Sequence, residues 1–289
     1  FGGVAAARLQ HTPMIVSYCL LPWLWLALDQ LRRHLRWRHA VLAGVVGGLS
    51  ALQLTQVTYL IVLACAVYTM AAIAMARARR TRLCLQLAAV GAIAAAISAP
   101  QWLSTFAWLA HTNRDGVSLQ AALPGAIHWQ SLVTLLSGNV FEQGRGDSWA
   151  FGDITTDYLY MGAVPLAVWL AWGGAVVRSD PRGARIALAV FVLAVLFALG
   201  GATPLFPWLF GWLPGLDLFR RPSDGLFLAV PAAAWLSAHA LQSALQRDPL
   251  RPHLPSLLVV VLLAIAGAWL VLGSGRLQGG AWLAISVAI

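Results

Sequence analysis

The sequence predicts an all-α fold, a polytopic bundle of transmembrane helices, and three observations support this prediction. Apolar residues make up 60% of the 289 residues, charged residues make up only 10%, and the mean hydropathy is +0.75. A water-soluble domain of this length does not need so much apolar surface. The basic residues are all arginines, and they gather in short segments between apolar runs, as in the cytoplasmic loops of membrane proteins. Membrane topology therefore explains the net charge of +9, and we expect no nucleic-acid partner.

We expect about eight to nine spans in a single transmembrane domain that covers residues 1–289. Hydropathy falls at 101–157, which predicts an extracytoplasmic loop. The stretch 201–224 is rich in tryptophan and proline and is expected to form a second extracytoplasmic segment. Abundant alanine, leucine and arginine without lysine suggests a GC-rich bacterial genome, so the expected location is the bacterial inner membrane, crossed several times. Because the chain opens at Phe1 without a start methionine and closes within an apolar run, we expect a fragment of a larger membrane protein.

The first half of the chain predicts three apolar segments after a loop or half-helix at 1–12. The first, 14–28, contains Pro22, which kinks a membrane helix without destroying it. The second, 40–52, is short for a bilayer, and 57–75 is a full span. The small residues of the second segment suit close helix packing; they are Gly44, Gly47 and Gly48.

Two arginine clusters flank the segment from 40 to 75, and the positive-inside rule assigns both to the cytoplasm. An even number of crossings must then separate them, so we predict a tight helical hairpin that turns near 53–56. The clusters consist of Arg32, Arg33, Arg36, Arg38, Arg77, Arg79, Arg80 and Arg82. The later spans are expected at 83–99, ending at Pro100, and at 158–177, 186–199, 226–245 and 256–272, with another starting at Ala281. An amphipathic surface helix is expected at 129–141.

The strongest candidate site is the sequence LPGLDLFRRPSDGLF at 213–227, directly before the span at 226–245. Arg220 and Arg221 are the best phosphate-binding candidates, because a guanidinium group binds phosphate in a bidentate fork. The alternative is that they anchor the helix or bind lipid headgroups. Ser223 or Asp224 could cap the following helix, or Asp224 could pair with an arginine and fix it.

Weaker candidates lie at the edges of other spans. Asp153 and Asp157 precede Tyr158 and could bind a metal or a sugar hydroxyl, or form a solvated helix start. We count Asp157 and Tyr158 as substrate-binding candidates, together with His11 at the mouth of the first span, whose alternative role is structural. Other candidates are Glu142 and Asp147, whose alternative is a mobile loop, and Gln53 and Gln56, whose alternative is hydrogen bonding across helices.

Soluble-enzyme motifs for nucleotides, zinc or a nucleophilic serine are absent. We assign no metal site and expect no cofactor; a divalent metal is conceivable but has no support in the sequence. Three cysteines lie in apolar segments at no metal-ligand spacing, so we interpret them as small core residues; they are Cys19, Cys65 and Cys84.

Four stretches resemble the YfhO-like bacterial membrane proteins, a branch of the GT-C-type glycosyltransferase superfamily. They read GGVAAARLQHTPMIVSYCLLPWLWLALD, LSALQLTQVTYLIVL, DYLYMGAVPLAVWLAW and LPGLDLFRRPSDGLFLAV, in this order along nearly the whole chain. The last resembles the strongest signature of the family, Leu-Pro-Gly followed by Phe-Arg-x-Pro and a helix. The predicted turn at 53–56 differs from the pattern of many members of this family, because Gln53 and Gln56 stand where a Gly-His pair is expected.

The resemblance implies transfer of a sugar from a polyprenyl-phosphate donor at the extracytoplasmic face, with membrane lipids as the surroundings. It also implies a catalytic carboxylate in the first outer loop, which we expect to lie before Phe1, so no catalytic base is assigned. The sugar, the acceptor and the oligomeric state are not predicted. The alternative function is a non-enzymatic multipass protein, either a transporter or a cell-envelope assembly factor.

Overall fold

The computed structural model describes residues 3–76, 79–109, 111, 116–135, 155–156 and 158–245, and these contain helices and no strand. The chain divides into two compact units. Unit 1 comprises Phe1–Arg8, Ala122–Trp212 and Arg221–Ile289, and unit 2 comprises Leu9–Ala121 and Leu213–Arg220. The all-α prediction is confirmed for the described residues, and each unit is described below by itself.

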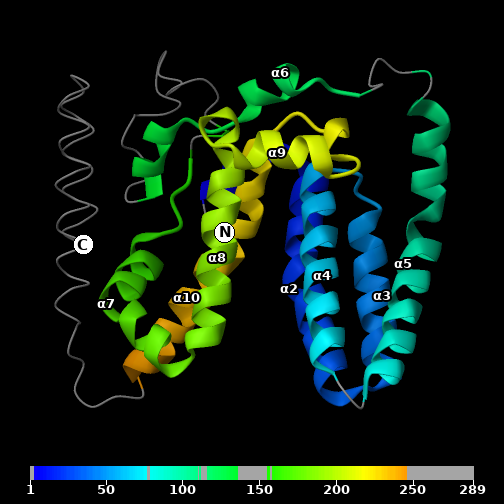
Figure 1. Cartoon of the computed structure of the whole chain (residues 1–289), viewed down its shortest axis with the longest axis horizontal. Coiled ribbons are helices and arrows are strands. Elements are labelled where there is room, and N and C mark those ends of the chain that lie inside the picture. Colours follow the sequence, from blue (N-terminus) through cyan, green and yellow to red (C-terminus); the bar gives the residue numbers. More distant parts are fainter. Residues whose placement is uncertain are drawn as a thin grey trace. The chain divides into compact units, whose positions relative to one another are not determined.

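Unit 2 is a bundle of helices α2 to α5 (Figure 1). Helix α2 packs against α3 and α4, and α3 also packs against α5. Within α3, a Cβ atom on Gly44 would lie 2.7 Å from Ile93 Cβ, and one on Gly48 would lie 2.7 Å from Ile97 Cβ. The expected close packing at these glycines is therefore present, and its partner is α5. The helices are α2 (Thr12–His34), α3 (Trp37–Ala51), α4 (Gln56–Met75) and α5 (Arg80–Leu109).

Two features of unit 2 differ from the predictions. The chain does turn between α3 and α4, as predicted, but the two helices do not form a tight hairpin, because each packs against α2 and α5 and not closely against the other. Helix α5 does not end at Pro100 but continues to Leu109. A proline within a helix removes one backbone donor, and an apolar helix in a membrane protein tolerates this loss.

Unit 1 is built around α10, which packs against α7 and α8 (Figure 1). Val176 of α7, Ala184 of α8 and Leu236 of α10 meet in the core between them. The described elements of this unit are α1 (Gly3–Ala6), η2 (Leu123–Gly125), η3 (Trp129–Leu135), α7 (Ala163–Ser179), α8 (Pro181–Ala198), η4 (Gly200–Ala202), α9 (Leu205–Trp212), η6 (Pro222–Gly225) and α10 (Leu226–Leu245). The short helix α6 (Leu119–Ala122) lies where the chain passes between the units.

The predicted eight to nine spans are not supported. Within the described residues, four helices are long and apolar enough to cross a membrane: α2, α4, α5 and the segment Pro222–Gln242 that contains α10. Helix α3 has 15 residues and is only about 22 Å long, short of the roughly 30 Å of hydrocarbon. These four helices indicate a membrane protein whose described residues form helices and no strand. The spans predicted at 256–272 and from Ala281 lie outside the described residues.

Two smaller predictions also need correction. The described part of the expected amphipathic helix is a 3-10 helix, Trp129–Leu135, and the remainder lies outside the described residues. The cysteines are not core residues: Cys19 is exposed, and Cys65 and Cys84 are half-buried and free. These cysteines need not be buried in the protein core, because a small apolar side chain on a membrane helix can face the lipid at no free-energy cost.

Candidate functional site

A buried ion pair lies in unit 1 directly before α10. Arg8 Nη1 donates to Asp224 Oδ1 at 3.0 Å, and both residues are 1% exposed. Arg8 Nη2 donates to Ser223 Oγ at 2.9 Å, and Arg8 Nε donates to the carbonyl oxygen of Thr155 at 2.7 Å. Each nitrogen of the guanidinium group therefore has an acceptor, as a buried cation requires. We call Arg8, Ser223 and Asp224 the Arg8–Asp224 centre.

The sequence around Asp224 explains why the chain takes this local structure. Pro222 stands at the start of the 3-10 helix η6, where its missing N–H costs no hydrogen bond. A Cβ atom on Gly225 would lie 2.7 Å from Phe197 Cδ1 and 3.0 Å from the carbonyl oxygen of Ala194. Only glycine therefore allows η6 to approach α8 so closely, and this approach helps to bury Asp224.

The N-terminal segment brings Arg8 to the same place. The backbone N–H of Gly3 donates to the carbonyl oxygen of Tyr160. A Cβ atom on Gly3 would lie 2.7 Å from Tyr158 Cδ1, so the close contact again depends on glycine. Helix α1 also packs against α10. These contacts hold the segment that ends at Arg8 against the head of α10.

Arg221 adds a second positive charge that acts on Asp224. Arg221 is half-buried and interacts electrostatically with Asp224. Within the described part of unit 1, two guanidinium groups thus act on one carboxylate. Asp224 Oδ2 is buried and has no hydrogen-bond partner among the described residues. A buried charge pair persists only where such partners hold it in place, and here the pair fixes η6 and with it the position of Arg221.

Asp224 takes one of its two predicted roles. It pairs with an arginine, but the partner is Arg8, which lies 216 positions away in the sequence. Arg221 stands at the N-cap position of η6 and its side chain makes no capping hydrogen bond. The sequence analysis did not select Arg8. A charged residue within the otherwise apolar stretch GGVAAARL is the signal that could have identified it, because a buried arginine needs a partner.

Arg220 and Arg221 belong to different units, although they are neighbours in sequence. Arg220 is exposed and ends the segment Leu213–Arg220 of unit 2. Tyr59 of α4 holds this segment, because its hydroxyl donates to the carbonyl oxygen of Pro214 at 2.8 Å and its ring centroid lies 5.4 Å from that of Phe219. The segment is therefore fixed to the first turn of α4.

The remaining candidates belong to different units or lie outside the described residues. His11 is half-buried in unit 2, at the N-cap position of α2, and makes no side-chain capping bond. Tyr158 is half-buried in unit 1, beside Gly3. Gln56 is buried and Gln53 is half-buried at the turn before α4. The predicted positions that lie outside the described residues are Asp157, Asp153, Glu142 and Asp147.

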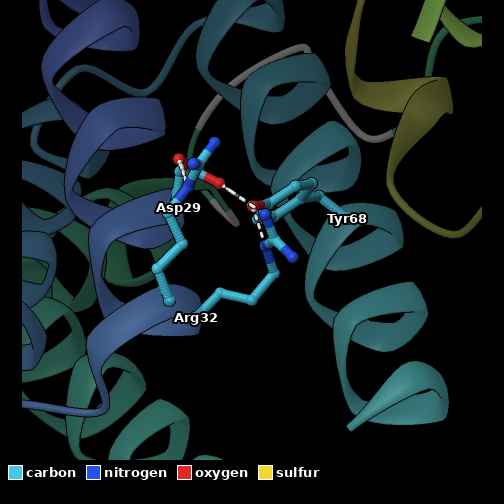
Figure 2. Close-up of polar contacts among 4 residues, drawn as sticks. Asp29, Arg32 and Tyr68 are labelled. Carbon is cyan, nitrogen blue, oxygen red and sulfur yellow. Dashed lines mark hydrogen bonds and ion pairs between the residues drawn. The ribbon is translucent and has the colours of Figure 1, made fainter. Parts of the chain in front are cut away.

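A second polar cluster joins α2 to α4 in unit 2, and Figure 2 shows it. Asp29 accepts hydrogen bonds from Arg32 Nη2 at 2.9 Å, from Arg33 Nε at 2.6 Å and from the Tyr68 hydroxyl at 3.2 Å. Arg32 Nε also donates to the Tyr68 oxygen at 3.1 Å. The sequence analysis expected a basic loop here. The structure instead places Arg32 and Arg33 in the last turn of α2, where a positive charge complements the helix dipole.

In the part of the chain that the structure describes, no three His, Cys, Asp or Glu side chains gather to hold a metal ion. Comparison of the chain with protein-family models, with curated proteins and with solved structures finds no match. The YfhO-like resemblance therefore remains a prediction. In the described residues, the structure shows helices that are long and apolar enough for a membrane, with a buried arginine–carboxylate centre at the head of one candidate span.

Proposed function

We propose that this protein is a GT-C-type membrane glycosyltransferase that uses a polyprenyl-phosphate-linked sugar at the extracytoplasmic face of a bacterial inner membrane. The observation that carries the proposal is the Arg8–Asp224 centre, which fixes the backbone at Arg221 directly before a candidate span. A lipid-linked donor has its tail in hydrocarbon and its phosphate at the membrane edge. A guanidinium group held at the head of a membrane helix suits that phosphate.

The chemistry assigns separate roles to the substrate groups and to the protein. In the transfer, the bond between the sugar anomeric carbon and a phosphate oxygen breaks, and the acceptor oxygen bonds to that carbon. The acceptor proton goes to a base, which we do not assign, and polyprenyl phosphate leaves with the bonding electron pair. Negative charge grows on the leaving phosphate, and Arg221 would stabilise that charge. Asp224 is a positioning residue in this scheme.

The distribution of charge supports this proposal over a transporter. A transporter needs ionisable groups near the bilayer midplane. Helix α4 contains no Asp, Glu, Lys or Arg, and α5 carries arginine only in its first turn. In α2 the charged residues lie in the last two turns. Chemistry at the membrane edge fits this arrangement better than transport through these helices.

Binding of polyprenyl phosphate by the purified full-length protein in detergent tests the proposal. We expect Arg220→Ala combined with Arg221→Ala to abolish binding while membrane insertion stays intact, and Arg221→Gln alone to weaken binding about tenfold, the loss of one charge-assisted contact. Arg182→Gln is the matched control, because Arg182 is an exposed arginine of α8 in the same unit as Arg221. Unchanged binding in the double variant would remove the phosphate assignment. If the wild-type protein binds polyprenyl phosphate, an assay for transfer of labelled sugar to an acceptor distinguishes an enzyme, which transfers the sugar, from a lipid-binding assembly factor, which does not.

A further inference from the structure

A pocket opens in unit 2 where α2 and α4 end and α5 begins. Its volume is about 220 Å³, and its lining includes Arg32, Arg79, Leu35, Ala72 and Leu83. We call it the Arg32–Arg79 pocket. Two arginines stand over an apolar floor, and this combination suits a molecule that has both an anionic and an apolar part.

The two guanidinium groups retain binding capacity. Arg32 uses Nε for the Tyr68 oxygen and Nη2 for Asp29, as Figure 2 shows, while its Nη1 has no hydrogen-bond partner among the described residues. The Arg79 side chain makes no hydrogen bond or ion pair with the described residues. The neighbouring Arg80 is used differently, because its Nε and Nη2 donate to the carbonyl oxygens of Ile73 and Ala74 at the end of α4. Arg32 Nη1 and the Arg79 guanidinium group can therefore donate hydrogen bonds to a ligand.

The floor of the pocket is preformed. Leu35, Ala72 and Leu83 belong to one buried cluster and are at most 6% exposed. Leu35 has φ 51° and ends α2, with its backbone N–H donating to the carbonyl oxygen of Leu31 at 2.8 Å. Gln86 of α5 donates from Nε2 to the Leu35 carbonyl oxygen at 2.9 Å. These contacts hold the end of α2, and with it Arg32, against α5 before any ligand binds.

The charge at this end of unit 2 identifies the class of ligand. Asp29 is the only carboxylate in residues 1–114, and it is already bound to Arg32 and Arg33. The arginine clusters of this region therefore need negative charge from outside the protein. The positive-inside rule assigns them to the cytoplasmic leaflet, whose anionic lipids attract arginine and whose headgroups enter basic pockets between helices.

We propose that the Arg32–Arg79 pocket binds the phosphate headgroup of an anionic phospholipid. Arg79 and Arg32 Nη1 contact the phosphate, and an acyl chain lies along the side of the pocket that Met75 lines, where this side chain is 69% exposed. This exposed apolar surface favours a lipid over a soluble phosphate compound, because a soluble ligand would leave it uncovered. The proposal concerns the end of α4 opposite the first turn that holds Pro214, so it is independent of the sugar-transfer proposal.

Titration of the purified full-length protein with phosphatidylglycerol or phosphatidylcholine in neutral detergent, followed by thermal melting, tests this proposal. Phosphatidylglycerol should raise the melting temperature of the wild type, and phosphatidylcholine should not. In Arg79→Gln the apparent affinity for phosphatidylglycerol should fall about fivefold, the effect of one arginine near an anionic headgroup. Arg82→Gln is the matched control, because Arg82 is exposed like Arg79 and lies three positions after it, but does not line the pocket. This variant should retain the wild-type affinity.

Three outcomes would overturn the proposal. Equal losses in Arg79→Gln and Arg82→Gln would show a diffuse attraction by the whole basic surface. Equal stabilisation by soluble glycerol 3-phosphate would show an anion site with no preference for lipid. Absence of any stabilisation of the wild type would remove the site altogether. Each variant is compared with its own melting temperature without lipid, so a change in intrinsic stability is not mistaken for lost binding.

Discussion

At the scale of single residues, Arg8 and Asp224 depend on each other because neither charge can reach water. Both are 1% exposed, and the hydrogen bonds of Arg8 go to Asp224, Ser223 and Thr155. Removal of one partner leaves the other charge buried and uncompensated, which is the costly case for buried ion pairs. Replacement of both by apolar groups avoids that cost.

We therefore expect Arg8→Met and Asp224→Leu each to destabilise the protein by about 3–5 kcal/mol, and the double variant to lose much less than the sum. Thermal melting of the purified variants in detergent measures the coupling. The exposed Arg182→Met is a control that should leave stability nearly unchanged. Additive losses would mean that the pair is not coupled as the distances indicate.

At the scale of elements, the glycines of α3 decide how closely two helices approach. Gly44 and Gly48 face Ile93 and Ile97 of α5. On the same helix, a Cβ atom added to Gly47 would lie 3.6 Å from its nearest neighbour, and one added to Gly91 of α5 would have no neighbour within 4 Å. Close approach through small residues is a principal source of helix association in membranes.

We expect Gly44→Ala to destabilise unit 2 by about 1–3 kcal/mol, because the added methyl group would meet the β-branched Ile93, which cannot move freely. Gly47→Ala and Gly91→Ala should be neutral or slightly stabilising, since alanine favours helices and the added methyl group would make ordinary contacts at position 47 and none within 4 Å at position 91. Melting temperatures of the three variants in one detergent provide the comparison. The same loss in all three would assign the effect to glycine itself and not to the α3–α5 contact.

At the scale of the whole molecule, the proposed function requires that the segment Leu213–Arg220 and the arginine clusters face opposite sides of the membrane. Within unit 2, Tyr59 in the first turn of α4 holds the segment Leu213–Arg220, whereas Arg80 caps the other end of the same helix. Helix α4 has 20 residues and is thus about 30 Å long, the thickness of the hydrocarbon core. Within unit 2, the segment Leu213–Arg220 and the residues that Arg80 contacts are therefore held at opposite ends of α4. Figure 1 shows that α4 extends from one end of this helical bundle to the other.

Cysteine labelling tests this arrangement in a variant from which Cys19, Cys65 and Cys84 have been removed. A membrane-impermeant maleimide added outside intact cells should label Arg220→Cys and should not label Arg36→Cys or Arg82→Cys. Permeabilised cells should show all three sites as reactive, which controls for local accessibility. Labelling of position 36 or 82 from outside, with position 220 protected, would reverse the topology and would remove the sugar-transfer proposal with it.

The sequence by itself determined that this is a helical membrane protein, and it placed α10 at its observed bounds. Such features depend on local properties: apolar length, arginine-rich turns and the breakers before Leu226. The bounds of other helices could not be predicted as well from the sequence. Helix α5 continues through Pro100, where the sequence predicted its end, because the surroundings of a membrane helix decide whether it tolerates a proline.

Only the tertiary structure decided which side chains meet. Arg8 and Asp224 are 216 positions apart, and Tyr68 lies 39 positions after Asp29, so no local pattern links either pair. The same holds for Arg32 and Arg79, which line one pocket only because α2 and α5 meet at that end of unit 2. Composition and hydropathy select a helix for the membrane, but the packing of helices against one another selects the partners of its buried charges.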